Sequence, residues 1–206
     1  MNKIIVIVLA FCFTSVSAMA GTLTLTLTFD KRPPYAGLAY LNDGGNFSNA
    51  PIDQTNKAFI SNAYIVTPNS KVDFVNSDDI DHNIYANSPT HNVKFDLGLL
   101  QPKQSITLSN SDWPTDAVIR IGCKIHPKMK SYIANVASSN SQVIAFDNKT
   151  KTYTVTLDNV SVANAPFALW LPGYDPIKVN IKQGETKSLK LMKRGKSKGT
   201  GSLSYQ

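Results

Sequence analysis

The sequence has few of the residues that build disulfide networks or elaborate catalytic sites. Only 2 cysteines and 3 histidines occur among its 206 residues. A multicopper oxidase needs many more histidines, and a Ser/His/Asp triad cannot be assembled here without using histidines that have another role. No glycine-rich phosphate loop follows a predicted strand. We therefore expect a protein that is not an enzyme.

Helical periodicity is also lacking. No segment carries a sustained apolar i, i+3, i+4, i+7 face, so little helix is expected. Apolar and polar residues instead alternate with a period of two in short runs separated by turn signals. The strands predicted in this way cover residues 22–28, 38–41, 63–67, 70–76, 83–86, 105–109, 117–122, 132–136, 142–146, 152–157, 167–171, 177–181 and 186–191. The predicted fold class is all-β, built from antiparallel sandwiches or barrels.

Long apolar runs are missing except near the N-terminus. Lys3 precedes the run Ile4–Phe13, and small residues follow up to Ala18-Met19-Ala20. A run of about ten residues is too short to cross a bilayer, and the pattern is that of a secretory signal peptide cleaved before Gly21. We therefore expect residues 1–20 to be a signal peptide, the mature chain to have no transmembrane segment, and its location to be the periplasm.

Removal of this leader would leave Cys123 as the single cysteine, because Cys12 lies within the leader. A lone thiol cannot form an internal disulfide, although the exported compartment permits disulfides. Such a thiol is buried and inert, paired with another chain, catalytic, or bound to a metal. Composition alone leaves these four roles open.

The chain is basic, with a formal net charge of +7 that falls by one when Lys3 is removed. One cluster of positive residues lies near the C-terminus and consists of Lys193, Arg194, Lys196 and Lys198. A positive balance suits an acidic partner or an anionic membrane, or it serves solubility alone, whereas export argues against nucleic acid. We expect 193–206 to be a disordered basic tail.

Two polar segments suggest boundaries. Residues 42–56 are rich in Gly, Asn and Ser and predict a long loop, and 137–141 are small and polar. The predicted organisation is an N-terminal segment of strands and loop (21–56), a domain that carries the chemistry (57–137) and a C-terminal β unit (142–192).

The chemistry is expected in the segment from Gly122 to Met129, where Cys123, His126 and Met129 lie within seven residues after an apolar strand. The strand delivers the cysteine at its end, and a short loop stiffened by Pro127 can fold the other two side chains back. A second histidine, His82, opens another predicted strand. Two imidazoles, one thiolate and a thioether suit a single copper ion that cycles between Cu(I) and Cu(II).

This pattern resembles the cupredoxins, the small blue copper proteins of the plastocyanin and amicyanin type. The loop Cys-Lys-Ile-His-Pro-Lys-Met is similar in length to the short amicyanin loop, and Asp81-His82-Asn83-Ile84 is similar to the family's first ligand segment. The resemblance spans about 57–136 and implies a Greek-key β-sandwich, copper bound by His82, Cys123, His126 and Met129, and hydrogen bonds from Asn83 that join the two ligand loops. Segments 95–98 and 103–106 also stand where the family has a strand and turn.

The longer arrangement is similar to exported methylamine-utilisation-like proteins, in which a small β-sandwich follows the copper loop. Residues 153–157 and 168–172 resemble that trailing module. The family resemblance implies a periplasmic one-electron carrier. The alternatives are a copper chaperone or resistance protein, which usually has more exposed Met- or His-rich motifs, or a binding role for the trailing unit with copper as an accessory.

The partner implied is a redox protein that docks near His126. Ile125 and Pro127 are candidates for an apolar contact, and Lys124, Lys128 and Lys130 favour an acidic partner surface. The oligomeric state stays open.

The other histidine, a pair of aspartates and four aromatic residues are expected to have no direct role in the metal site. His91 is expected in an exposed loop, with a ligand role only if it lies near the copper. Asp78 and Asp79 are expected to be solvated, and Trp113, Trp170, Tyr85 and Tyr132 are expected in the core or at its rim.

Overall fold

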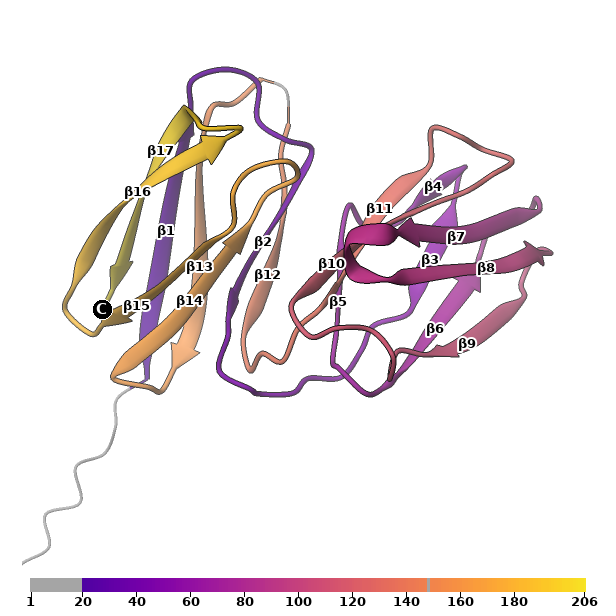
Figure 1. Cartoon of the computed structure of the whole chain (residues 1–206), viewed down its shortest axis with the longest axis horizontal. Coiled ribbons are helices and arrows are strands. Elements are labelled where there is room, and N and C mark those ends of the chain that lie inside the picture. Colours follow the sequence, from indigo (N-terminus) through magenta and orange to yellow (C-terminus); the bar gives the residue numbers. More distant parts are fainter. Residues whose placement is uncertain (1–19, 148) are drawn as a thin grey trace, which may run out of the picture.

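The computed structural model describes residues 20–147 and 149–206, so that the predicted signal peptide lies outside the described residues except for Ala20. The described part folds into four β-sheets arranged as two sandwiches side by side (Figure 1). A single 3-10 helix, η1 (Pro89–His91), occurs in this part of the chain. None of its helices has the length and apolarity needed to cross a membrane. The all-β prediction is confirmed.

The first sandwich packs a five-stranded sheet, in the order β5-β11-β10-β7-β8, on a four-stranded sheet, in the order β4-β3-β6-β9. The chain passes between the two sheets several times, so that residues far apart in sequence become neighbours. The side chains enclosed between the sheets include Phe74, Ile84 and Ile119, all fully buried. The strands are β3 (Ile52–Thr55), β4 (Ala58–Phe59), β5 (Tyr64–Val66), β6 (Lys71–Asn76), β7 (His82–Ser88), β8 (Val93–Leu100), β9 (Ser105–Ser109), β10 (Ala117–Gly122) and β11 (Lys130–Asn135).

The second sandwich consists of two four-stranded sheets, ordered β13-β1-β17-β16 and β12-β2-β14-β15. In β1 the leucines at 23, 25 and 27 are at most 1% exposed and alternate with threonines that face outward, as the period of two predicts. The strands are β1 (Gly21–Phe29), β2 (Ala36–Leu41), β12 (Ser141–Ala145), β13 (Thr152–Val160), β14 (Asn164–Trp170), β15 (Ile177–Lys182), β16 (Thr186–Lys193) and β17 (Lys196–Tyr205).

The predicted boundary of the C-terminal unit at 142–192 is too narrow. This unit also takes β1 and β2 from the N-terminal segment, because their apolar faces complete its core. The predicted boundary of the first unit is too late, since β3 pairs in parallel with β6, with Ile52 opposite Phe74. Only one apolar residue occurs in β3, so alternation could not reveal it.

The prediction of a disordered tail at 193–206 is wrong. Arg194 and Gly195, with φ of 51° and 71°, form a two-residue turn that returns the chain as β17, between β1 and β16. Two inward positions of β17 are Gly199 and Gly201, so the strand has little apolar signal. A Cβ at Gly199 would lie 2.3 Å from the carbonyl oxygen of Thr28, which shows how closely β1 approaches.

A third buried cluster joins the two sandwiches. It contains Leu38, Tyr40 and Ala168 from the second sandwich, and Ala134 and Val136 from the strand β11 region of the first. All six residues of β2 are buried, because one face of the strand contacts the core of its own sandwich and the other contacts the first sandwich. The two units are therefore held by a continuous apolar contact.

The position of β17 predicts a stability effect. Leu203 is fully buried in the core of the second sandwich, and Leu203→Ala should lower the free energy of unfolding of that unit by about 2–5 kcal/mol. Urea denaturation followed by circular dichroism measures the change. Ser202→Ala, an exposed neighbour on the same strand, is the control, and an equal small effect of both changes would contradict the placement of β17.

Candidate metal centre

The β10–β11 hairpin fixes the loop with three of the predicted ligands. Gly122 pairs with Lys130, so that residues 123–129 form the connecting loop. The N–H of Met129 donates to the carbonyl of His126 at 2.9 Å, which closes a turn within the loop. The Tyr35 hydroxyl donates to the Lys130 carbonyl at 3.1 Å and anchors the loop at its C-terminal end.

His82 reaches this loop because of strand pairing. It is the first residue of β7, which pairs with β10 through Gly122 opposite Tyr85. The strand that begins at His82 therefore lies beside the strand that ends just before Cys123. A glycine suits position 122, because an added Cβ would lie 3.2 Å from the Tyr85 ring.

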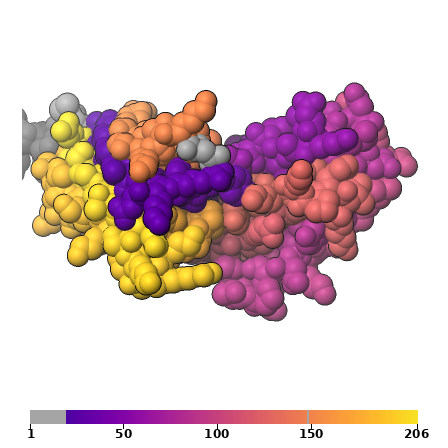
Figure 2. Space-filling model, turned by 90° about the horizontal axis from the view of Figure 1, so that it is seen from above, coloured from indigo at the N-terminus to yellow at the C-terminus, as the bar shows by residue number. Residues whose placement is uncertain are grey.

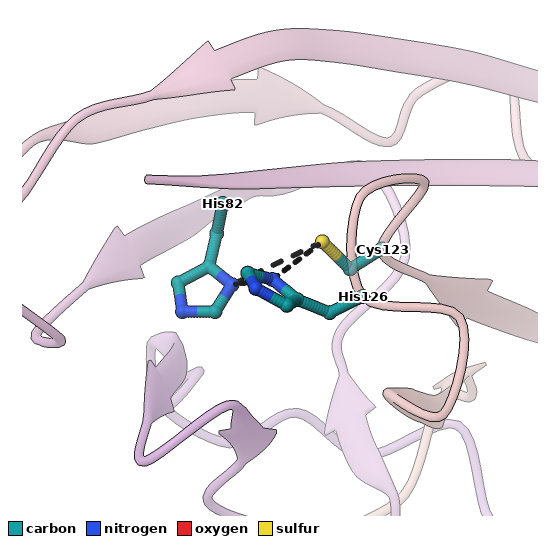
Figure 3. Close-up of side chains that lie close together, drawn as sticks. All are labelled: His82, Cys123 and His126. Carbon is teal, nitrogen blue, oxygen red and sulfur yellow. Dashed lines mark hydrogen bonds between the residues drawn. The ribbon is translucent and has the colours of Figure 1, made fainter. Parts of the chain in front are cut away.

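Three potential ligand atoms converge at this point (Figure 3). The Sγ atom of Cys123 lies 3.9 Å from Nδ1 of His82 and 3.7 Å from Nδ1 of His126. The two Nδ1 atoms lie 3.1 Å apart. Both imidazoles thus present the same ring nitrogen toward the thiol.

These separations fit one shared metal ion. With metal–nitrogen distances of about 2.0–2.1 Å and a metal–sulfur distance of about 2.3 Å, ligands in trigonal or tetrahedral geometry lie roughly 3.3–3.8 Å apart. The observed 3.1–3.9 Å is close to that range. Two imidazoles and one thiolate are the donor set of a trigonal copper site.

The centre is shielded on most sides. His82, Cys123 and Met129 are at most 4% exposed, whereas His126 is partly exposed. Burial, followed by the influence of His82, lowers the pKa of His126, which favours the neutral imidazole that can bind a metal. Met129 is buried in the same core cluster as Cys123, and its axial ligation stays a prediction.

Asn83 connects the two ligand segments. Its backbone N–H donates to Cys123 Sγ at 3.4 Å, and its side-chain oxygen accepts the N–H of Lys124 at 3.3 Å. Its Nδ2 donates to Asp96 at 2.6 Å and to the Gly98 carbonyl at 3.0 Å. Asn83 therefore ties the start of β7 to the loop that begins at Cys123.

Asp96 extends this network, because the same carboxylate also accepts a hydrogen bond from Lys124 Nζ. The Lys124 ammonium and the N–H of Gly98 hold the pKa of Asp96 below its ordinary value. The positive charge of Lys124 is therefore paired within the molecule.

Asp78 is the functional residue that the sequence did not reveal. Its carboxylate lies 2.9 Å from Nε2 of His82 and is 14% exposed, so the expectation that it is solvated is wrong, whereas Asp79 is 94% exposed. The N–H of Lys57 donates to Asp78 at 2.8 Å and, with His82, holds the pKa of Asp78 below its ordinary value. The spacing of four residues between Asp78 and His82 was the available signal.

This contact orients the first histidine. A carboxylate at Nε2 fixes the proton there and leaves Nδ1 free to face the thiol and His126. The Lys57 N–H comes from the β3–β4 turn, where Asn56 and Lys57 both have positive φ. The β3–β4 hairpin, which was not predicted from the sequence, thus positions the Asp78 carboxylate, and this carboxylate in turn orients His82.

His91 lies away from this group. It is in η1, at the other end of β7, where its Nδ1 lies 2.9 Å from Ser88 Oγ. It lines a cavity of about 230 Å³ together with Trp170 and Lys178 of the second sandwich. The aromatic Trp113 stacks on Phe95 within the first core.

Comparisons with known proteins found matches among solved structures. No family model matches the chain, and no curated protein matches it. Among solved structures, a reduced amicyanin mutant is 13% identical and matches over 47% of this chain and 97% of its own, with a TM-score of 0.37. A purple cupredoxin from Nitrosopumilus maritimus is 15% identical over 37% of this chain and 80% of its own, with a TM-score of 0.32.

The Asp78 contact predicts an effect on a bound copper ion. A negative charge close to His82 stabilises Cu(II) more than Cu(I). Asp78→Asn removes the charge while an amide oxygen can still accept the Nε2–H. We expect the ratio of Cu(II) to Cu(I) affinity to fall about tenfold, so that voltammetry shows a reduction potential higher by about 59 mV.

Asp79→Asn is the matched control. It also removes one negative charge, but from the neighbouring residue, whose side chain is exposed and pairs with Lys103. An equal shift of the reduction potential in both variants would show that the potential responds to net charge in general and not to the contact between Asp78 and His82. In the diamagnetic Cu(I) form, the His82 Nε2 proton should give a downfield NMR signal whose position changes in Asp78→Asn alone.

Proposed function

We propose that this chain is a mononuclear copper protein that carries one electron at a time between redox partners in the periplasm. The observation that carries the proposal is the convergence of His82 Nδ1, Cys123 Sγ and His126 Nδ1 within 3.9 Å of one another. The periplasmic location is supported by the leader pattern in residues 1–20.

Copper at this point would supply a one-electron couple, and the protein would supply a fixed coordination geometry. Electron transfer is fast when ligands barely move between oxidation states. His82 is fixed by Asp78, and Cys123 by the Asn83 N–H. The backbone carbonyl of His126 accepts the N–H of Met129, and this hydrogen bond closes the loop that carries His126.

The burial of the site favours an electron carrier over a copper chaperone. Three of the four proposed ligands are at most 4% exposed, so release of the ion would require the loop to open. A protein that hands over copper needs ligands that a recipient can reach. Outside the leader the chain has only two methionines, Met129 and Met192, which is few for a Met-rich transfer motif.

We place the electron exit at His126, the proposed histidine ligand that reaches solvent. Ile125, next to it in the loop, is 50% exposed, and Leu99, opposite Asn83 in the β7–β8 pair, is 55% exposed. These apolar side chains form a docking surface for a redox partner. Lys124 is paired with Asp96, so an acidic partner would be attracted chiefly by Lys128 and Lys130.

Removing the thiol tests the copper centre. The protein with Cu(II) should show an intense visible band from thiolate-to-copper charge transfer, and Cys123→Ala should abolish it. His126→Ala should abolish or strongly alter the band. His91→Ala is the matched control and should retain it, because His91 lies at the far end of β7. A band that survives in Cys123→Ala would contradict the proposal.

Replacing the apolar contact tests the proposed exit. Ile125→Ser should slow electron self-exchange at least severalfold, because two molecules must meet through this surface. NMR line broadening in mixtures of the reduced and oxidised protein measures the rate. Val162→Ser, which alters an exposed apolar residue of the second sandwich, should leave the rate unchanged, and a similar slowing by both variants would place the exit elsewhere.

A further inference from the structure

Charge is divided unequally between the two sandwiches. Residues 52–136, which form the first sandwich, contain eight Lys or Arg and eight Asp or Glu, so that unit has no net charge. Residues 21–51 and 137–206, which form the second, contain twelve basic and six acidic residues. The whole positive excess outside the leader therefore belongs to the sandwich without the candidate metal centre.

This excess is gathered at one end of the second sandwich, here called the basic end. Three turns meet there (Figure 1), and Figure 2 shows the same segments together, in indigo, orange and yellow. The Phe29 N–H donates to the Lys151 carbonyl at 2.9 Å, and the Asp30 N–H to the Lys198 carbonyl at 3.0 Å. The basic end consists of Lys31, Arg32, Lys149, Lys151, Lys193, Arg194, Lys196 and Lys198.

Few negative charges offset this set. The three turns contain two acidic residues, Asp30 and Asp147, and a third, Asp175, lies beside them, since its N–H donates to the Met192 carbonyl at 2.9 Å. One carboxylate oxygen of Asp147 accepts the N–H groups of Lys149 and Thr150, which shapes its own turn. Within the described residues, none of Lys149, Lys151, Lys193, Lys196 and Lys198 forms an ion pair with a carboxylate.

Part of this arrangement opposes folding, although the Lys193 ammonium also lies 5.1 Å from the centroid of the Tyr174 ring. Lys193 and Lys196 are paired directly across the β16–β17 turn, and like charges at such positions destabilise a hairpin. Elsewhere several lysines pair with a nearby carboxylate, as Lys103 does with Asp79 and Lys178 with Asp116. A set of like charges kept together at a cost in stability is better explained by binding than by solubility, for which dispersed charges of both signs suffice.

We propose that the basic end binds the anionic surface of a lipid bilayer. The cationic side chains come from three turns at one end of the sandwich, so they face an extended negative plane together. Each Lys or Arg held near such a surface strengthens binding roughly fivefold. The first sandwich has no net charge, so this attraction does not draw the candidate metal centre to the membrane.

The orientation that results keeps the metal centre accessible. His82 begins β7 at the end of the first sandwich that faces away from the second, whereas η1 at the other end of β7 lies near it (Figure 1). A protein bound through the basic end therefore leaves the His126 edge free for a soluble partner. The proposal does not depend on copper and can be tested with the metal-free protein.

Sedimentation with vesicles tests the proposal. The protein should bind phosphatidylglycerol-containing vesicles but not pure phosphatidylcholine vesicles, and binding should weaken steeply as salt rises. Lys193→Glu with Lys196→Glu should weaken binding at least about twentyfold. Both positions then carry a negative charge, so the pair across the turn is still a pair of like charges. Lys71→Glu with Lys94→Glu is the matched control, because it changes net charge equally on exposed positions of the first sandwich.

Three results would overturn the inference. One is no binding to phosphatidylglycerol vesicles at low salt. Another is equal weakening by the two double variants, which would show that net charge alone governs binding. The third is tighter binding to soluble polyglutamate than to vesicles, which would assign the basic end to an acidic polymer. Thermal unfolding of each variant, with an unchanged midpoint, shows that the fold is intact.

Discussion

The candidate metal centre depends on hydrogen bonds that hold two distant segments in one place. Asn83 donates its backbone N–H to Cys123 and accepts the N–H of Lys124, while the residue before it, His82, is fixed by Asp78. Each of these contacts joins the start of β7 to a neighbouring segment. Without them the two imidazoles and the thiol would have to be organised by the metal itself, and the geometry would then follow the preference of each oxidation state.

The packing of the first sandwich supplies the second part of this constraint. Cys123 and Met129 belong to the same buried cluster as Phe74, Ile119 and Ile133. The loop between them therefore begins and ends in the hydrophobic core, and only its middle, around Ile125 and His126, reaches solvent. Rigidity at the base and exposure at the tip are both consequences of where a seven-residue loop leaves and rejoins the sheet.

Much of the fold and the central residues of the site could be predicted because they rest on local patterns. Alternation in β1 and the spacing of Cys123, His126 and Met129 are visible in the chain itself. Asp78 could not be predicted with the same ease, because its role depends on the Lys57 N–H, which comes from another hairpin. The strand β17 was missed for a related reason: its glycines fit against β1, and that fit exists only after the sheet has formed.

The second sandwich also determines how the first one is attached. The chain leaves it after β2 and returns at β12, and these two strands pair directly, with Tyr40 opposite Ser141. The first sandwich is thus an insertion held by two adjacent connections, and the contact between the Tyr132 and Trp170 rings adds a further attachment between the two sandwiches. A unit tied at two neighbouring points cannot swivel as one on a single linker can, so the orientation of the metal centre relative to any surface that the second sandwich binds is set by the fold.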